Sequence, residues 1–318
     1  MSIGTIKKVV DTLCKMRPTG KINVSFLGGG EPFMAWEVMK KSIEYIRALG
    51  DEKRFSIGVT TNGTLLTSEI IDFLYKNVVN VSVSFDILPE IQNVQRPMKN
   101  GIDSYEIVNK KLGMLIDRNV IPSIRTTIMP IAADKMADMV EAIHMSYPQI
   151  KQIHFEHVTM KDLKYDNYYK IFQKSFWIAR EKGKEYGILV KNSITTCMGR
   201  LTSRFCYGEM SITPTGDILA CHRVSSVNDK LFFNFKYGHA SEDGIELNDN
   251  ALLSTDEFMN CIKDKCKRCF MKYHCAGICS NNAHSYSEEQ MEDLCLFIQE
   301  MGYEFLFHWV NQALPQNT

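Results

Sequence analysis

The chain has 318 residues, of which 45% are hydrophobic and 23% charged, as in a soluble globular protein of one large or two ordinary domains. Its formal net charge is zero, so no excess of positive charge indicates binding to nucleic acid or to an anionic membrane. No apolar run approaches the roughly 20 residues of a membrane span, and the N-terminus lacks the pattern of a signal peptide. Ten cysteines in such a chain indicate metal binding in a reducing cytoplasm rather than disulfides.

Helical and strand patterns alternate through the first part of the chain. Apolar residues at the helical period predict helices over 5–16, 37–48, 68–76 (capped by Ser68), 104–118, 133–146 and 166–186. Segments rich in β-formers predict five strands, over 22–27, 55–60, 80–86, 122–128 and 150–158. Most of these strands have polar residues at the C-terminal end, which is typical of a parallel (β/α) barrel or open sheet with its site on that edge.

The periodicity breaks down at about residue 190, and nine of the ten cysteines lie from Cys197 onward. We therefore predict an α/β domain over 1–190 and a small cysteine-rich domain over 191–318. A long last helix is expected from Ser287 to about Leu314, with Cys295 near its start.

Seven cysteines in the second domain have regular spacing. Four follow C-x2-C-x5-C-x3-C, a fifth stands alone further on, and two frame C-x9-G-x4-C; they are Cys266, Cys269, Cys275, Cys279, Cys295, Cys206 and Cys221. Such a set indicates that something binds the thiolates. Four thiolates suit a [4Fe–4S] cluster and also a tetrahedral zinc ion, so spacing alone leaves both open.

The first predicted strand runs into Gly28-Gly29-Gly30-Glu31-Pro32. Glycines at a strand end let a ligand approach the backbone closely. The alternative is a tight strand-to-helix turn.

Several segments together resemble radical S-adenosylmethionine (SAM) enzymes with a C-terminal SPASM domain, the maturases of sulfatases, thioether peptides and quinone-cofactor precursors. The similar segments are Phe26-Leu-Gly-Gly-Gly-Glu-Pro-Phe33, Thr61-Asn-Gly-Thr64, Ser84-Phe-Asp86 with Arg96-Pro97, Arg125-Thr-Thr-Ile128, and the seven cysteines. The resemblance implies a partial six-strand (β/α) barrel followed by a small iron–sulfur domain.

One family motif is missing. No C-x3-C-x2-C, which ligates the radical-generating [4Fe–4S] cluster in the family, occurs in the 318 residues. The strand before Gly28 corresponds to the family's second strand, so the first strand and its cysteine loop would precede Met1. The chain is then either truncated or a degenerate relative. We favour truncation, because the missing piece is one structural unit while eight candidate cysteines downstream are intact.

The resemblance assigns SAM binding to Gly29, Gly30, Glu31, Asn62, Ser84, Asp86 and Arg125. The glycines and Glu31 would hold the methionyl amine, Ser84 and Arg125 the carboxylate and ribose. Asn62 and Asp86 would orient these segments, or serve only as turn and strand-end caps. Two departures concern the loop after Asp86: Ile87 replaces the usual glycine, and Gln92-Asn93 stands where His-Asp is common.

The resemblance also implies two auxiliary clusters. The nearer would take Cys206, Cys221 and Cys279, with Cys197 as candidate fourth ligand, and the outer Cys266, Cys269, Cys275 and Cys295. Cys261 is left over as a helix cysteine without a role. His222 stands where sulfatase-maturing relatives have an aspartate, and is our candidate base or else a hydrogen-bond donor to the cluster. Glu156 and His157 are possible substrate contacts, and His154 a structural histidine.

The leading hypothesis is an enzyme whose deoxyadenosyl radical abstracts hydrogen from a peptide or protein side chain, for instance to form a thioether crosslink. The alternatives are a sulfatase-maturing enzyme, which His222 disfavours, and a non-catalytic iron–sulfur or zinc protein. The implied cofactors are SAM, two auxiliary [4Fe–4S] clusters, and a radical cluster only if a missing N-terminal segment supplies its ligands. The expected partners are a peptide or protein substrate and a reductant such as ferredoxin or flavodoxin.

Overall fold

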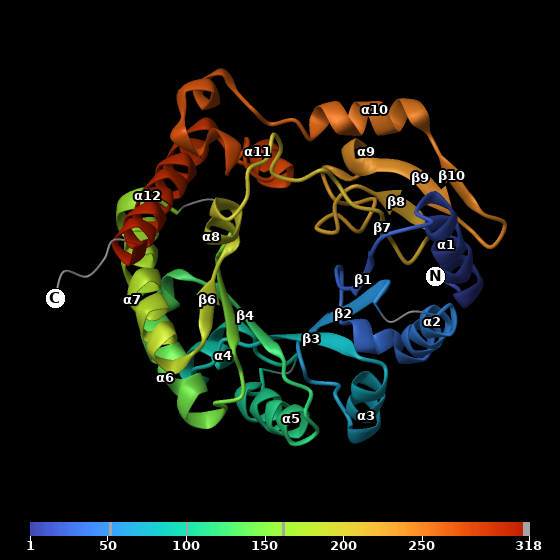
Figure 1. The fold of residues 1–318 in the computed structure, drawn as a ribbon, viewed down its shortest axis with the longest axis horizontal. Helices are drawn as coiled ribbons and strands as arrows, with labels where there is room; N and C mark the ends of the chain where they lie inside the picture. Colours follow the sequence, from blue (N-terminus) through green and yellow to red (C-terminus); the bar gives the residue numbers. More distant parts are fainter. Residues whose placement is uncertain (51–52, 100, 161–162, 314–318) are drawn as a thin grey trace. The chain divides into compact units, whose positions relative to one another are not determined.

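The computed structural model describes residues 1–50, 53–99, 101–160 and 163–313 (Figure 1). Its main element is a six-stranded sheet in which the strands stand in chain order. They are β1 (Ile22–Phe26), β2 (Phe55–Thr61), β3 (Val79–Ser84), β4 (Ser123–Ile128), β5 (Gln152–His157) and β6 (Leu189–Lys191). The pairs β1–β2, β2–β3 and β5–β6 are parallel. The α/β class predicted from the alternating patterns is confirmed.

Helices connect these strands. They are α1 (Ile3–Met16), α2 (Trp36–Ala48), α3 (Ser68–Lys76), α4 (Pro89–Gln95), α5 (Tyr105–Asp117), α6 (Met136–Ser146) and α7 (Lys170–Tyr186). In α3 the cap is Thr67 and not Ser68 as predicted, because Thr67 has the extended backbone of a cap and its side chain accepts a hydrogen bond from the Ile70 amide.

Two elements of the sheet region were missed. The strand β6 has three residues, too few to show an alternating pattern, and its pairing with Gln152–His154 of β5 defines it. The helix α4 has seven residues and begins at Pro89, in a segment that we had taken as a loop.

The chain packs as two compact units, which we describe separately. Unit 1 comprises Met1–Phe85, Arg96–Ile124 and Gly208–Met259, and unit 2 comprises Asp86–Gln95, Arg125–Tyr207 and Asn260–Thr318. Each unit contains residues from both sides of 190. The predicted boundary at 190 stays a prediction, since it concerned family domains and not packing.

Unit 1 combines β1–β3 with a four-stranded antiparallel sheet of order β10-β9-β8-β7. Its strands are β7 (Ser211–Ile212), β8 (Asp217–Leu219), β9 (Lys236–Ala240) and β10 (Ile245–Leu247), and its helices α9 (Phe232–Phe235) and α10 (Asp249–Phe258). Val9 of α1 is buried in one apolar cluster with Ile218, Leu219 and Phe235. The first helix therefore packs against the antiparallel sheet, although some 200 residues of chain separate them.

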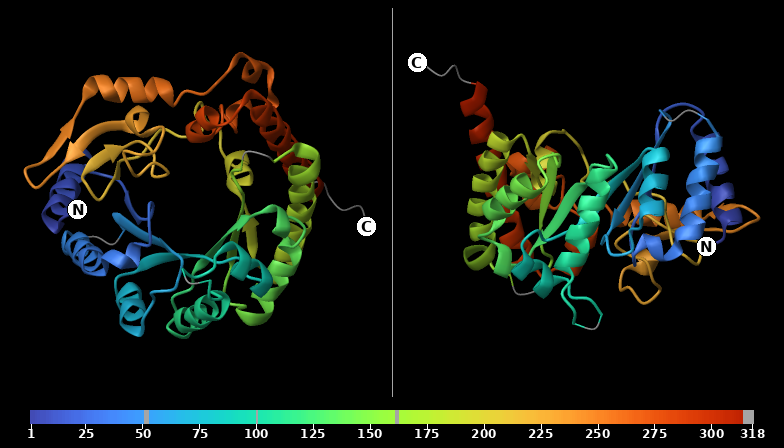
Figure 2. Two further views of the ribbon diagram at one scale, coloured as in Figure 1. Left: turned by 180° about the vertical axis from the view of Figure 1, so that it is seen from behind. Right: turned by 90° about the horizontal axis from the view of Figure 1, so that it is seen from below.

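In unit 2 the helix α7 packs against β6, and α6 and α7 lie side by side in each view (Figures 1 and 2). Its further elements are η3 (Tyr165–Tyr169), α8 (Ser193–Met198), η4 (Asp264–Arg268), η5 (Phe270–Tyr273), α11 (Ser280–Ser285) and α12 (Glu288–Ala313). The predicted last helix is thus found, and its predicted end at Leu314 lies outside the described residues. Phe297 of α12 stacks on Tyr169, with ring centroids 4.7 Å apart, and anchors α12 in an aromatic core.

Candidate functional site

The glycine loop of unit 1 lies at the C-terminal edge of the sheet. Gly28, Gly29 and Gly30 are exposed and follow β1 after one residue, Leu27. A methyl group added to Gly30 would meet no atom within 4 Å. The loop thus offers an open backbone edge, which fits a ligand held by main-chain atoms.

Glu31 fixes this loop to the neighbouring strand. Its carboxylate accepts hydrogen bonds from the Thr61 hydroxyl at 2.7 Å, the Asn62 amide at 2.7 Å and the Phe33 amide at 3.3 Å. The ends of β1 and β2 are therefore tied by one carboxylate. A carboxylate has about four acceptor positions, so the predicted contact of Glu31 with the SAM amine stays possible and untested.

Asn62 has a local role in the structure. Its side-chain oxygen accepts hydrogen bonds from the Thr64 amide at 2.9 Å and the Thr64 hydroxyl at 2.7 Å, which is an Asx turn. Ser84 ends β3 at the same sheet edge and is half-buried. The SAM roles of both residues stay predictions.

The segment after Cys221 packs against the glycine loop within unit 1. A methyl group on Gly29 would lie 2.6 Å from the Ser225 hydroxyl oxygen, and one on Gly28 would lie 3.6 Å from the His222 carbonyl oxygen. The structure therefore brings the predicted SAM loop and the candidate base His222 into one neighbourhood.

His222 is paired with Glu209, which the sequence analysis missed. The ring Nδ1 lies 2.6 Å from the Glu209 carboxylate, and the His222 amide also donates to it. Burial raises the pKa of Glu209, but the hydrogen bonds and charge of His222 outweigh it, so the net pKa is lowered. The carboxylate favours a proton on Nδ1 and directs Nε2 away from itself. The only sequence signal was a glutamate three residues after Cys206.

Steric crowding explains why the motif C-x9-G-x4-C has a glycine at Gly216. Gly216 has φ +94° in the turn between β7 and β8, and a methyl group there would lie 2.3 Å from the Ala240 carbonyl oxygen. Only glycine fits such a turn so close to β9. After this turn the chain continues through β8 to Cys221, which is half-buried.

Cys275 is the centre of a thiol group in unit 2. Its pKa is raised to about 12, mainly by burial and in addition by the charges of Cys295, Cys266 and Cys197. Burial also raises the pKa of Cys295, on which the charges of Cys266 and Cys269 act as well. The Cys269 amide donates to the Cys266 carbonyl at 3.2 Å, and η5, between Cys269 and Cys275, packs against α12, which carries Cys295. All four cysteines predicted for the outer cluster thus lie on neighbouring segments. Their ligand role stays a prediction, but the donor set fits four-thiolate ligation of a [4Fe–4S] cluster.

Cys197, predicted for the nearer cluster, is buried on the helix α8. Its sulfur accepts a hydrogen bond from the Arg200 guanidinium at 3.4 Å. Within the described ranges, no three His, Cys, Asp or Glu side chains converge as ligands of a single ion would. In a [4Fe–4S] cluster each thiolate binds a different iron, so its ligands are spread around the cluster.

Asp86 begins a strained turn in unit 2. It is fully buried; its carboxylate accepts a hydrogen bond from Gln95 at 2.7 Å, and its amide donates to Gln92 at 2.8 Å. Ile87, at the position where relatives have glycine, has φ +66°. Arg125 is exposed on β4. For both Asp86 and Arg125 the SAM role stays a prediction.

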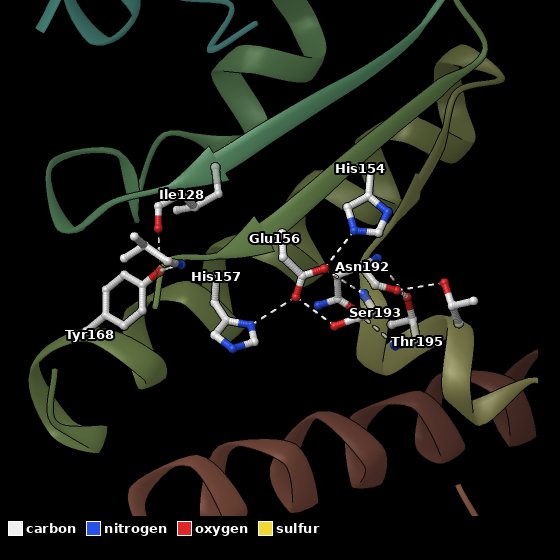
Figure 3. A network of polar contacts seen from close by, with 10 residues as sticks. Ile128, His154, Glu156, His157, Tyr168, Asn192, Ser193 and Thr195 are labelled. Atoms are coloured by element: carbon white, nitrogen blue, oxygen red, sulfur yellow. Dashed lines mark hydrogen bonds and ion pairs between the residues drawn. The ribbon is translucent and has the colours of Figure 1, made fainter. Parts of the chain in front are cut away.

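Glu156, at the end of β5, organises a polar network (Figure 3). Its carboxylate contacts His154 Nε2 at 2.7 Å, His157 Nδ1 at 3.1 Å and the Ser193 hydroxyl at 2.6 Å. Burial raises the pKa of Glu156, yet the two histidines hold it well below its usual range. His154 is the satisfied structural histidine that we predicted, and Glu156 links β5 to the start of α8.

A sequence model of the radical SAM superfamily matches residues 1–145. The uncharacterized protein MJ0907 of Methanocaldococcus jannaschii is 24% identical over 248 residues, 72% of this chain and 80% of that protein. The radical SAM cyclopropyl synthase TigE of Paramaledivibacter caminithermalis is 23% identical over 296 residues, 87% of this chain and 58% of that enzyme.

Solved structures show the same fold. Native anSMEcpe with bound AdoMet has a TM-score of 0.76 at 18% identity, covering 98% of this chain and 90% of that chain. The same protein with AdoMet and Kp18Cys peptide has a TM-score of 0.75 at 17% identity, covering 98% and 89%. Streptococcus suis SuiB has a TM-score of 0.59 at 14% identity, covering 91% and 69%. The predicted partial parallel (β/α) barrel is thereby confirmed. Among the described residues, no helix has the length and apolar character needed to cross a membrane.

Proposed function

Since residues 1–145 of this chain form a radical SAM domain, we propose that the protein is a radical SAM enzyme that modifies a side chain of a peptide or protein. TigE, a radical SAM cyclopropyl synthase, supports the reaction class, and anSMEcpe, solved with AdoMet and Kp18Cys peptide, supports the substrate class. The observation that carries the proposal is the packing of the glycine loop against the His222–Ser225 segment. The backbone that we propose to bind SAM thus lies close to the candidate base.

The residues of unit 1 would hold SAM and move a proton. The open edge at Gly30 would accept the methionyl amine, and Glu31 would keep that edge in place through Thr61 and Asn62. Bound SAM, reduced by an iron–sulfur cluster, supplies a deoxyadenosyl radical that abstracts a hydrogen atom. The chain has no C-x3-C-x2-C, so the ligands of that cluster would come from outside these 318 residues.

His222 would remove the proton that the modified side chain loses. Glu209 orients its ring at 2.6 Å and would stabilise the imidazolium that forms. A histidine in place of aspartate favours a peptide modification such as a thioether crosslink over formylglycine formation. The cysteines that the resemblance assigns to the auxiliary clusters would hold them, and these clusters would anchor substrate or accept an electron.

The test uses the chain together with any in-frame sequence that precedes Met1 in its native gene. Anaerobically purified, iron-loaded protein is reduced with dithionite in the presence of SAM, and 5′-deoxyadenosine is measured. We expect its formation in the parent protein and in His222→Ala, because His222 acts after hydrogen abstraction. No deoxyadenosine from the parent protein would overturn the proposal in favour of a non-catalytic iron–sulfur protein.

A further inference from the structure

The loop Ala276–Ile278, between Cys275 and Cys279, has an uncommon backbone. All three residues have positive φ, at +47°, +89° and +67°. Left-handed backbone is unfavourable for alanine and more so for a β-branched residue, so packing must hold the loop in place. The contacts that hold it come from two cysteine-bearing segments of unit 2.

The first segment carries Cys261. A methyl group on Gly277 would lie 2.7 Å from the Cys261 carbonyl carbon and 2.7 Å from the Ile262 amide nitrogen. The loop therefore presses directly on the Cys261 backbone, a contact that only glycine at 277 permits. Cys261 follows α10 in a stretch without helix, so our description of it as a helix cysteine was wrong.

The second segment carries Cys206. The Phe205 amide donates to the Ala276 carbonyl at 3.3 Å, and the Thr202 amide to the Tyr273 carbonyl at 2.8 Å. The residues before Cys206 thus run along the chain that leads to Cys279. The segments that carry Cys206 and Cys261 therefore contact adjacent residues of this loop, Ala276 and Gly277, and Cys279 follows the loop directly.

The thiol of Cys261 faces the helix that follows Cys279. His284 lies on α11, which begins directly after Cys279. His284 Nε2 lies 3.7 Å from the Cys261 sulfur. The half-buried Cys261 sulfur therefore lies beside the segment that begins at Cys279.

We propose that Cys261 is a ligand of the iron–sulfur cluster that the family resemblance assigns to Cys206 and Cys279, in the place for which Cys197 was the candidate. The two candidates lie beside different cysteines, because Arg200 donates to the Cys197 sulfur at 3.4 Å and its carbonyl oxygen lies 2.9 Å from the ring of His274, next to Cys275. The inference rests on the proposed function, since the cluster itself is taken from the family. It adds a ligand outside the seven-cysteine pattern.

The first experiment uses the unmodified chain. Iron-loaded and chelator-stripped protein are treated with iodoacetamide under anaerobic conditions, and each cysteine is quantified by mass spectrometry. We expect labelling of Cys261 to fall at least about tenfold on iron loading, together with Cys279, while Cys14 of α1 labels equally in both. Equal labelling of Cys261 in both forms, with Cys279 protected, would overturn the inference.

The second experiment compares Cys261→Ser with Cys197→Ser by iron content and by electron paramagnetic resonance of the reduced protein. We expect Cys261→Ser to lose about four irons, or to keep them with a changed spectrum, as ligand loss requires. An unchanged iron content and spectrum in Cys261→Ser would overturn the inference. So would a result in which Cys197→Ser loses about four irons and Cys261→Ser loses none. A parent chain that binds no iron contradicts the proposed function instead. If Cys261→Ser does not fold, the labelling of the unmodified chain decides.

Discussion

Ile87 shows how a single departure from the family pattern appears in the structure. The residue is 2% exposed and has φ +66°, a conformation that glycine adopts without cost and a β-branched residue does not. Both truncations, Ile87→Ala and Ile87→Gly, lose the buried side chain. We expect the glycine variant to be more stable than the alanine variant by about 1 kcal/mol, because only alanine keeps the left-handed penalty.

The measurement is urea unfolding of the two variants, with Ile91→Ala and Ile91→Gly as the matched pair. Ile91 is 3% exposed in the helix α4. At this helical position the alanine variant should be more stable than the glycine variant by about 1 kcal/mol in unfolding free energy. The same order of stability at both positions would contradict strain at Ile87.

Two adjacent glycines differ in what surrounds them. Gly29→Ala places a methyl group 2.6 Å from the Ser225 hydroxyl oxygen and 3.0 Å from its Cβ, so we expect a loss of about 1–3 kcal/mol in unfolding free energy. The double variant with Ser225→Gly should restore most of that loss, since it removes both atoms.

Gly30→Ala is the matched control, because its methyl group meets nothing within 4 Å. Its stability should stay within about 0.5 kcal/mol of the parent protein. If SAM occupies the open edge, its affinity should nevertheless fall by about tenfold or more, measured by calorimetry. Unchanged SAM affinity in Gly30→Ala would remove this edge from the proposed site.

At the scale of elements, Glu156 joins β5 to α8. The variant Glu156→Gln removes a charge that His154, His157 and Ser193 surround, and we expect it to cost about 1.5–3 kcal/mol at pH 7. The exposed pair Glu141–Lys182, joining α6 to α7 at 2.5 Å, gives the control, and Glu141→Gln should change stability little.

The pH dependence follows from the direction of the pKa shift. The folded pKa of Glu156 lies below the unfolded one, so its contribution is complete above about pH 4.3 and is lost as the pH falls from there through the folded pKa. The difference between the parent protein and Glu156→Gln should therefore shrink below pH 4.3. The titratable groups that interact electrostatically with Glu156 are His154, His157 and Cys197. A difference that grows on acidification would contradict this assignment.

At the scale of the whole molecule, metal and folding are linked. Buried thiols such as Cys275 are held neutral until a cation binds, so cluster loading should stabilise the fold that groups them. We expect removal of iron by a chelator to lower the melting temperature by roughly 5–10 °C in calorimetry. Cys275→Ser should show a smaller difference between loaded and stripped protein, whereas Cys14→Ser should behave as the parent. Identical melting of both forms would indicate that the thiols hold no structural cluster.

Sequence reasoning worked where the information is local. The strands that end at Phe26, Thr61 and Ser84 were found because β-rich runs of five or more residues carry their own pattern. It failed at β6, whose three residues are a strand only because β5 pairs with them. It also missed Glu209, which has no distinguishing neighbour in the sequence and becomes notable only beside His222.

The sequence by itself determined the alternation of strands and helices, the glycine loop at a strand end and the spacing of seven thiols, because these are properties of consecutive residues. The tertiary structure decided which distant groups meet: Ser225 with Gly29, Glu209 with His222, and Cys261 with Gly277. The physical reason is that such contacts depend on how whole segments pack. Periodicity places a side chain on a face of its own element, but the burial of that face selects its partner.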